Sequence, residues 1–254
     1  ISTLENLMVP KRLALFAGTV SPLAAFGMVC GMVFPILMFP AAILFGLCEL
    51  LIPELARCNA AGSKNRIRYL AGRSLHISCV YGCGCGGLLF LGAGNLCAQL
   101  YGDASAGEML RLFSLLAPML YCDSVTDAMT KGLGQQKIAV RYNILTAAMD
   151  VVLLYFLLPK MGIIGYFTSF LVTHLINFLL SMDRLLKITI KKIPSKIPLL
   201  SGASIIFAVW AAANLSNNAL RCCAYLLILG ALLFLGGIIS REDLRWLKGL
   251  VYKK

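Results

Sequence analysis

Long apolar segments follow one another along the chain, and a short polar or basic stretch separates each from the next. A helix needs about 20 apolar residues to cross the hydrocarbon core of a bilayer. The ten-residue alternating patterns of a transmembrane barrel do not occur in the sequence, and helices bond all their backbone polar groups internally in lipid. The pattern therefore predicts an all-α, polytopic transmembrane helix bundle of about seven spans, at 31–56, 70–100, 109–131, 139–159, 163–183, 198–215 and 220–240.

Two prolines, Pro35 and Pro40, interrupt the first of these segments. Each proline removes a backbone hydrogen bond from a helix, so kinks are expected. The kinks have two interpretations: curvature that helps the helix to pack, or a hinge in a helix that moves.

Short motifs indicate how other segments pack. In the second segment, GCGCGGLLFLGAG contains Gly82 and Gly86, a small-xxx-small pair that lets helix backbones approach closely. The fourth and fifth segments are joined by LLPKMGIIGY, a tight Pro-x-x-Gly connection. We therefore expect helix packing at the glycine pair, and the fourth and fifth helices to be antiparallel neighbours.

Composition places the chain in a membrane. Hydrophobic residues make up 59% of the 254 residues and charged residues only 13%, and the mean hydropathy is +0.84. A soluble domain of this size needs more charge to cover its surface. The predicted location is the cell membrane, with the chain crossing it several times.

The net charge of +12 raises the question of nucleic-acid binding, but the distribution of Lys and Arg gives another answer. Of the 23 basic residues, 18 lie around 57–73, 131–141, 184–196 and 241–254, at alternate ends of the predicted spans. This is the positive-inside pattern. It predicts an external start, a cytoplasmic C-terminus and contacts with anionic lipids, and no nucleic-acid partner.

Residue usage argues against catalytic and metal chemistry. The ten cysteines fall almost entirely inside apolar segments and form no C-x-x-C pair, which favours a packing role. The two histidines, His76 and His174, lie in different segments. No H-E-x-x-H or other catalytic signature occurs. We therefore expect no enzyme activity, no metal site and no cofactor.

Polar side chains form stripes on the fourth and fifth predicted helices. Asp150 is the informative member, because a carboxylate in a membrane costs roughly 2.5–3.5 kcal/mol on insertion scales and usually marks a cavity or an ion path. The neighbouring helices should bring the two stripes face to face. Their members, spaced by three or four residues, are Asn143, Thr146 and Asp150 on the fourth helix, and Ser169, Thr173, Asn177 and Ser181 on the fifth.

A second group of charges lies in APMLYCDSVTDAMTKGLGQQ. Asp127 and Lys131 form an i,i+4 pair in the favoured orientation. Asp123 is two turns from Lys131 and shares a helix face with Asp127, so it needs either a positive partner or water. Arg141 could reach Asp127. A water-filled cavity lined by Asp123, Asp127, Lys131 and Arg141 satisfies these constraints, and such cavities are typical of transporters.

His174 has two interpretations. It lies on one helix with Thr173 and Asn177, which favours a hydrogen-bonded histidine at a helix interface. The alternative is a proton relay.

Several of these stretches also resemble a known family. APMLYCDSVTDAMTKGLGQQ, the following RYN, LLPKMGIIGY, HLINFLLS, ENLMVPKRL and FPAAILFGLCELLIPELARCNA occur in the same order and spacing in polysaccharide transporters of the stage V sporulation protein B type. These transporters belong to the multidrug/oligosaccharidyl-lipid/polysaccharide flippase superfamily. The resemblance covers residues 1–188 and identifies the chain with the C-terminal half of such a protein.

The resemblance implies the second lobe of a two-lobed MATE/flippase-like fold, with the N-terminal lobe as its partner. Residues 1–20 would end a preceding transmembrane helix and form an external linker, and 21–188 would be the second-lobe bundle of about five spans. Residues 189–254 would form a basic cytoplasmic loop, an accessory two-helix hairpin and a basic tail. Some relatives carry a cation site in this lobe, for Na⁺ or H⁺ coupling. Here it would comprise Asn143 or Thr146, Asp150, and a hydroxyl from Thr168 or Ser169.

The function expected from the resemblance is the flipping of lipid-linked saccharide precursors of the envelope or spore cortex by alternating access. One alternative is a cation-coupled MATE-type multidrug exporter, whose acidic and aromatic cavity would use Asp123, Asp127 and Tyr121. Another alternative is a membrane scaffold that transports nothing. A scaffold should tolerate replacement of Asp123 and Asp150, whereas either carrier should not.

Overall fold

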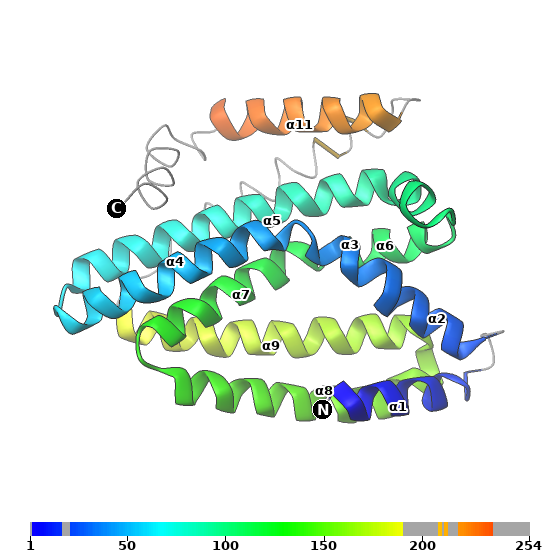
Figure 1. Ribbon diagram of the computed structural model, residues 1–254, viewed down its shortest axis with the longest axis horizontal. Coiled ribbons are helices and arrows are strands. Elements are labelled where there is room, and N and C mark those ends of the chain that lie inside the picture. The colour runs from blue at the N-terminus through cyan, green and yellow to red at the C-terminus, as the bar shows by residue number, and fades with distance from the viewer. Residues whose placement is uncertain (1, 17–20, 190–207, 210, 213–217, 236–254) are drawn as a thin grey trace.

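The computed structural model describes residues 2–16, 21–189, 208–209, 211–212 and 218–235, and the side chains of 2–6, 189 and 218–219 lie outside this description. Every element in the described part of the chain is helical (Figure 1). In chain order the helices are α1 Ser2–Leu13, α2 Pro22–Met28, the π-helix η1 Val29–Val33, α3 Phe34–Met38, α4 Ala41–Ala60, α5 Lys64–Tyr101, α6 Ala106–Ser114, α7 Ala117–Gly132, α8 Gln136–Met161, α9 Ile163–Thr189 and α11 Asn218–Leu235.

The all-helical prediction is confirmed for the described residues, but the expected number of spans is wrong. Three helices are long and apolar enough to cross a membrane: α5, α8 and α9. A fourth span results if Pro22–Met38 and Ala41–Ala60, which meet at an angle of 59°, cross the bilayer as one bent helix. The predicted span at 198–215 lies mostly outside the described residues.

The predicted span at 109–131 is two helices, α6 and α7, which break at Leu115 and Leu116. Pro118 explains the break, because it lies in the first turn of α7, where a missing N–H costs nothing, whereas inside a continuous helix it would remove a hydrogen bond. The predicted span at 220–240 begins within α11, whose apolar part, Leu220–Leu235, is shorter than the three spans.

Of the two prolines expected to kink a helix, only Pro40 lies at a sharp bend. Pro35 lies in the first turn of α3, directly after η1, and the helical run from Pro22 to Met38 continues past it. Pro40 lies at the sharp bend before α4. Tyrosines from other helices bond two backbone carbonyls at the bend. Tyr121 Oη donates to Leu37 O at 2.6 Å, and Tyr81 Oη donates at 2.8 Å to Pro40 O, which also accepts the Ile43 N–H at 3.3 Å.

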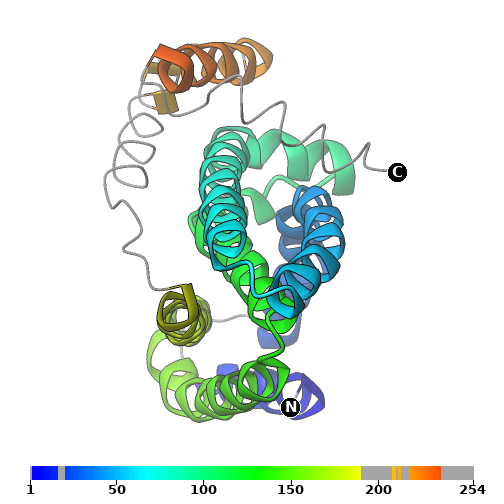
Figure 2. The same ribbon diagram turned by 90° about the vertical axis from the view of Figure 1, so that its left-hand side faces the viewer.

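Glycine allows α5 to pack closely against α6 and α7. A Cβ atom at Gly82 would lie 2.9 Å from Pro118 Cα, and one at Gly86 would lie 3.0 Å from the Ser114 carbonyl oxygen. Real Cβ atoms rarely approach backbone atoms this closely. The predicted packing role of this pair is therefore confirmed. On another side of the bundle α11 lies next to α5 (Figure 2), and its Tyr225 hydroxyl donates to Gly84 O at 3.1 Å.

The α8–α9 pair forms the antiparallel hairpin that the Pro-x-x-Gly turn predicts (Figure 1). Gly162 makes the turn with a φ of +58°, a conformation that glycine adopts without strain. Only 17% of the most apolar 18-residue stretch of α8 is buried inside the bundle. Such a large exposed apolar surface is costly in water and is the normal surface of a helix in lipid. Exposed apolar side chains on α8 include Ile144, Leu145, Val152 and Phe156.

The basic residues gather at one end of the bundle, as the sequence pattern predicts. The α4–α5 connection, the α7–α8 connection and the last turns of α9 all lie at the same end (the left of Figure 1). We call this the basic end. Its described basic residues include Arg57, Lys64, Arg66, Arg68, Lys131, Lys137, Arg141, Arg184 and Lys187. Its assignment to the cytoplasm remains a prediction.

Candidate functional site

Asp150 on α8 is held by hydroxyl groups of α9. Ser169 Oγ donates to Asp150 Oδ1 at 2.6 Å, and Thr173 Oγ1 lies 3.4 Å from the same oxygen. The two predicted stripes therefore face each other around this carboxylate. All four stripe residues of α9, Ser169, Thr173, Asn177 and Ser181, are buried.

A cavity of about 220 Å³ lies beside Asp150. This volume is large enough for several water molecules, because a single water needs only about 10–15 Å³ of probe-occupied space. Both α8 and α9 contribute polar side chains to its wall, beside apolar surface. The lining residues are Asn143, Thr146, Ala147, Asp150, Phe170, Thr173, His174 and Asn177.

The structure separates the two hydroxyls that the sequence offered for the cation site. Ser169 bonds Asp150, whereas Thr168 Oγ1 donates to Ile164 O of its own helix at 2.8 Å. Thr146 lines the cavity, and its hydroxyl donates to Tyr142 O at 2.9 Å. Ser169 and Thr173 thus contact Asp150, Asn143 and Thr146 line the same cavity, and Thr168 does neither.

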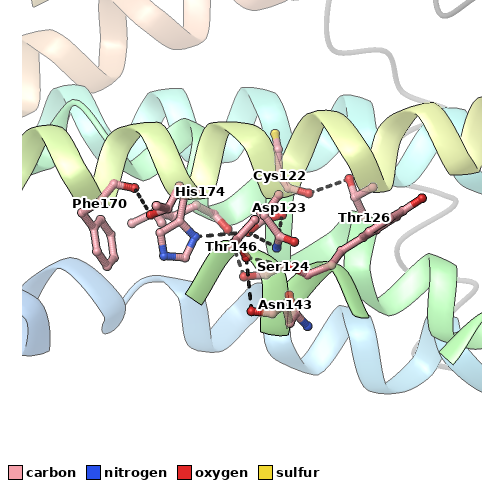
Figure 3. A network of polar contacts seen from close by, with 12 residues as sticks. Cys122, Asp123, Ser124, Thr126, Asn143, Thr146, Phe170 and His174 are labelled. Atoms are coloured by element: carbon pink, nitrogen blue, oxygen red, sulfur yellow. Dashed lines mark hydrogen bonds and ion pairs between the residues drawn. The ribbon is translucent and has the colours of Figure 1, made fainter. Parts of the chain in front are cut away.

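Asp123 on α7 is buried, with only 6% of its surface exposed, whereas Asp150 is half-buried. The partners of Asp123 come from α9: Asn177 Nδ2 donates to Oδ1 at 3.2 Å and to Oδ2 at 3.3 Å, and His174 Nδ1 lies 3.3 Å from Oδ2 (Figure 3). These partners are an amide and an imidazole, neither of which carries a permanent positive charge. The sequence required a positive partner or water at Asp123, and it did not identify these two side chains.

His174 links the two carboxylate sites. Its ring packs on Phe170, with 4.3 Å between the ring centroids, and it lines the cavity beside Asp150. Its Nδ1 atom meets Asp123 on the other side (Figure 3). His174 lies on α9 directly beside the stripe residues Thr173 and Asn177. The extension of the polar face to His174 was therefore the available signal that α9 contacts two helices.

Asp127 and Lys131 form the ion pair expected from their spacing, with 2.6 Å between Lys131 Nζ and Asp127 Oδ2. The other Asp127 oxygen, Oδ1, is buried and has no hydrogen-bond partner in the described part of the chain. Asp127 therefore contributes a local ion pair with one carboxylate oxygen unused.

Tyr121 and Arg141 lie away from the aspartates. Tyr121 is buried in the core, where it bonds the carbonyl at the bend and stacks near Tyr81. Arg141 is exposed and lines a hollow of about 570 Å³ at the basic end, together with Gln135, Gln136 and Lys137. A role for these residues in a transport cavity stays a prediction.

Oxygen and nitrogen donors of different kinds surround the two carboxylates. In the described residues no three His, Cys, Asp or Glu side chains come together as metal ligands. Asp150 is surrounded instead by hydroxyl and amide groups, which are hard donors compatible with Na⁺ or with a protonated carboxyl group.

Comparison with known proteins adds no assignment: no protein-family model, curated protein or solved structure matches the chain.

Proposed function

We propose that the chain is one lobe of a membrane carrier that moves lipid-linked saccharide precursors by alternating access, with a cation bound at the Asp150 cavity. The observation that supports this most is Asp150 itself. It lies on an apolar helix, accepts the Ser169 hydroxyl and borders a polar cavity.

The cost of the charge is the physical argument. A carboxylate at membrane depth costs roughly 2.5–3.5 kcal/mol on insertion scales, so a helix that only packs has little reason to keep one. Asp150 has no fixed cation beside it in the described residues; its bonded neighbours are the Ser169 and Thr173 hydroxyls. A site of this kind can exchange a small cation with water in the cavity, and the bound cation offsets the charge.

The substrate class follows from the resemblance and from charge. Lipid-linked saccharides carry an anionic phosphate or pyrophosphate group, which arginine and lysine bind well. Lys137 and Arg141 line the hollow at the basic end, and neither makes an ion pair in the described part of the chain. They would attract this headgroup where the positive-inside pattern predicts the cytoplasm.

The two alternatives have less support. A drug exporter would use Tyr121 in its cavity, but the Tyr121 hydroxyl is bonded to Leu37 O in the core. A scaffold would not need a buried carboxylate, Asp123, and a half-buried one, Asp150, whose partners are amide, imidazole and hydroxyl groups.

The test is Asp150→Asn in the whole protein. We expect the rate of flipping of a fluorescent lipid-linked saccharide in liposomes to fall on the order of a hundredfold, within the range typical for loss of one charged functional group, with an unchanged amount of protein in the membrane. The control is Asp183→Asn. Asp183 is an exposed aspartate on α9, the helix next to α8, and it pairs with Lys187 of the same helix. Wild-type flipping by Asp150→Asn would remove Asp150 from the mechanism and favour the scaffold.

A further inference from the structure

Four buried polar atoms on α7 and α9, two helices that pack against each other, have no hydrogen-bond partner in the described part of the chain. Asn177 and Ser181 lie on α9 and are 7% and 1% exposed. The other two residues are Asp127 on α7 and Arg184 near the end of α9. The atoms are Asn177 Oδ1, Ser181 Oγ, Asp127 Oδ1 and Arg184 Nε. We call them the α7–α9 file.

Helix geometry arranges these atoms in order. α7 and α9 run in the same direction toward the basic end (Figure 1), and Asp123 contacts Asn177. One helical turn, about 6 Å further along both helices, brings Asp127 level with Ser181. The file then ends near Arg184, whose Nη2 donates to Gln135 Oε1 at 2.7 Å in the loop between α7 and α8.

Unpaired buried polar atoms point to water. In folded proteins nearly all buried polar groups have a hydrogen-bond partner, and ordered water supplies the partner where protein does not. Four such atoms in sequence along one helix interface therefore indicate a chain of water molecules. This chain would begin at Asp123 and end at the basic end.

We propose that His174 is a proton relay between the Asp150 cavity and Asp123, and that the α7–α9 file carries the proton onward to the basic end. This inference rests on the proposed function and deepens it, because it identifies a proton as a coupling ion. The Asp150 cavity supplies the proton from water.

The geometry of His174 suits a relay. Its side chain is 34% exposed and lines the cavity, so one edge of the ring meets water, while Nδ1 meets Asp123. Phe170 packs on the ring and holds this orientation. Histidine is also the side chain that most readily gains and loses a proton near neutral pH. The titratable groups that face it are Asp123 on α7 and Asp150 on α8, with Asp127 one turn along α7.

The proton count balances over one cycle. A proton from cavity water binds His174 Nε2, and the proton on Nδ1 passes to Asp123 Oδ2. Asp123 is then a neutral acid, and His174 is neutral with its proton on Nε2. Asp123 releases its proton to water beside Asn177 and Asp127. The His174 ring then turns about its Cβ–Cγ bond, so that Nδ1 takes a proton from cavity water while Nε2 releases one to it, and the ring turns back to Asp123 in the Nδ1–H form. Neither side chain is changed at the end.

The experiment measures proton flux without saccharide. The whole protein is reconstituted in liposomes containing a pH-sensitive dye, and a potassium diffusion potential drives protons. We expect a flux well above that of empty liposomes. His174→Gln and Asp123→Asn should each lower it on the order of a hundredfold, as for loss of a proton-transfer group. The matched control is His76→Gln, which replaces the second of the two histidines and should keep the flux.

Chemical rescue separates a relay from a structural role. His174→Ala should regain proton flux when imidazole is added, because free imidazole can enter the cavity and replace the lost ring. A misfolded variant would not respond. The proposal is overturned if the wild-type protein carries no proton flux, if His174→Gln keeps the flux, or if imidazole fails to rescue a variant whose helical circular dichroism is unchanged.

These outcomes are distinct from those of the saccharide test. A wild-type protein that flips saccharide without proton flux overturns only the relay. A protein that carries protons through His174 but flips no saccharide overturns only the carrier proposal.

Discussion

At the scale of single residues, three buried or half-buried aspartates are stabilised in three different ways. Asp127 has a permanent cation, Lys131. Asp150 has the hydroxyls of α9, and Asp123 has an amide and an imidazole. A fixed cation cancels a carboxylate charge, whereas neutral donors leave that charge available to a proton or a metal cation. Asp123 and Asp150 are therefore the two side chains suited to ion exchange.

The amide of Asn177 should be the main structural support of Asp123. Asn177→Ala removes both of its hydrogen bonds to the carboxylate, and bonds to charged groups contribute about 1.5–3 kcal/mol each. We expect a loss of at least about 1.5 kcal/mol in the free energy of unfolding, measured by denaturant titration in detergent.

The matched control for this prediction is Ser181→Ala, one turn further along α9. The Ser181 hydroxyl makes no contact with Asp123, and its only partner would be water of the α7–α9 file, so its removal should lower the free energy of unfolding by less than Asn177→Ala does. Equal effects of the two variants would mean that Asn177 does not stabilise Asp123.

At the scale of helices, side chains from two other helices stabilise the bend at Pro40. Two carbonyls at the bend, Leu37 O and Pro40 O, accept hydrogen bonds from the hydroxyls of tyrosines on α7 and α5. The bend is therefore tied to the helix that carries Asp123. If α3 and α4 move as a hinge, these two bonds must break or move with it.

Tyr121→Phe should show how much this tie matters. It removes the 2.6 Å bond to Leu37 O and leaves a buried carbonyl without its partner, which costs about 1–3 kcal/mol. We expect a lower melting temperature in detergent than for the wild-type protein. The control is Tyr69→Phe, because Tyr69 is 52% exposed. Identical melting of the two variants would contradict a stabilising role for the tie.

At the scale of the whole molecule, charge and apolar surface divide the bundle in the way a membrane requires. The described basic residues of α4, α5, α7, α8 and α9 gather mainly at the basic end, and α8 presents an apolar surface outward. The positive-inside rule then predicts that the basic end is cytoplasmic.

Protease sites inserted in two loops can test this orientation. One site follows Gly62 in the α4–α5 connection, and the other follows Asp103 between α5 and α6. Because α5 is a single helix of 38 residues, the two sites should be cut from opposite sides of oriented membrane vesicles, the first from the cytoplasmic side. Cleavage of both sites from the same side would show that α5 does not span the membrane.

Sequence patterns predicted the local features well and the long-range ones poorly. The helical class, the α8–α9 hairpin, the close packing at Gly82 and Gly86, and the facing of Asp150 with the α9 hydroxyls all follow from spacing along one or two adjacent helices. The number of spans could not be predicted from such spacing, because the residues on the two sides of a helix break are equally apolar. Pro118 starts α7 and ends the expected continuous span.

The sequence by itself determined which segments are helical, where the basic residues lie along them and which faces are polar, because helical periodicity and proline and glycine effects are local properties of the chain. Only the tertiary structure decided that His174 and Asn177 meet Asp123, 51 and 54 residues away, and that Tyr121 bonds the bend rather than a cavity. These contacts depend on which helices pack together and at what register. That choice is made by the packing of the whole bundle, which no single segment encodes.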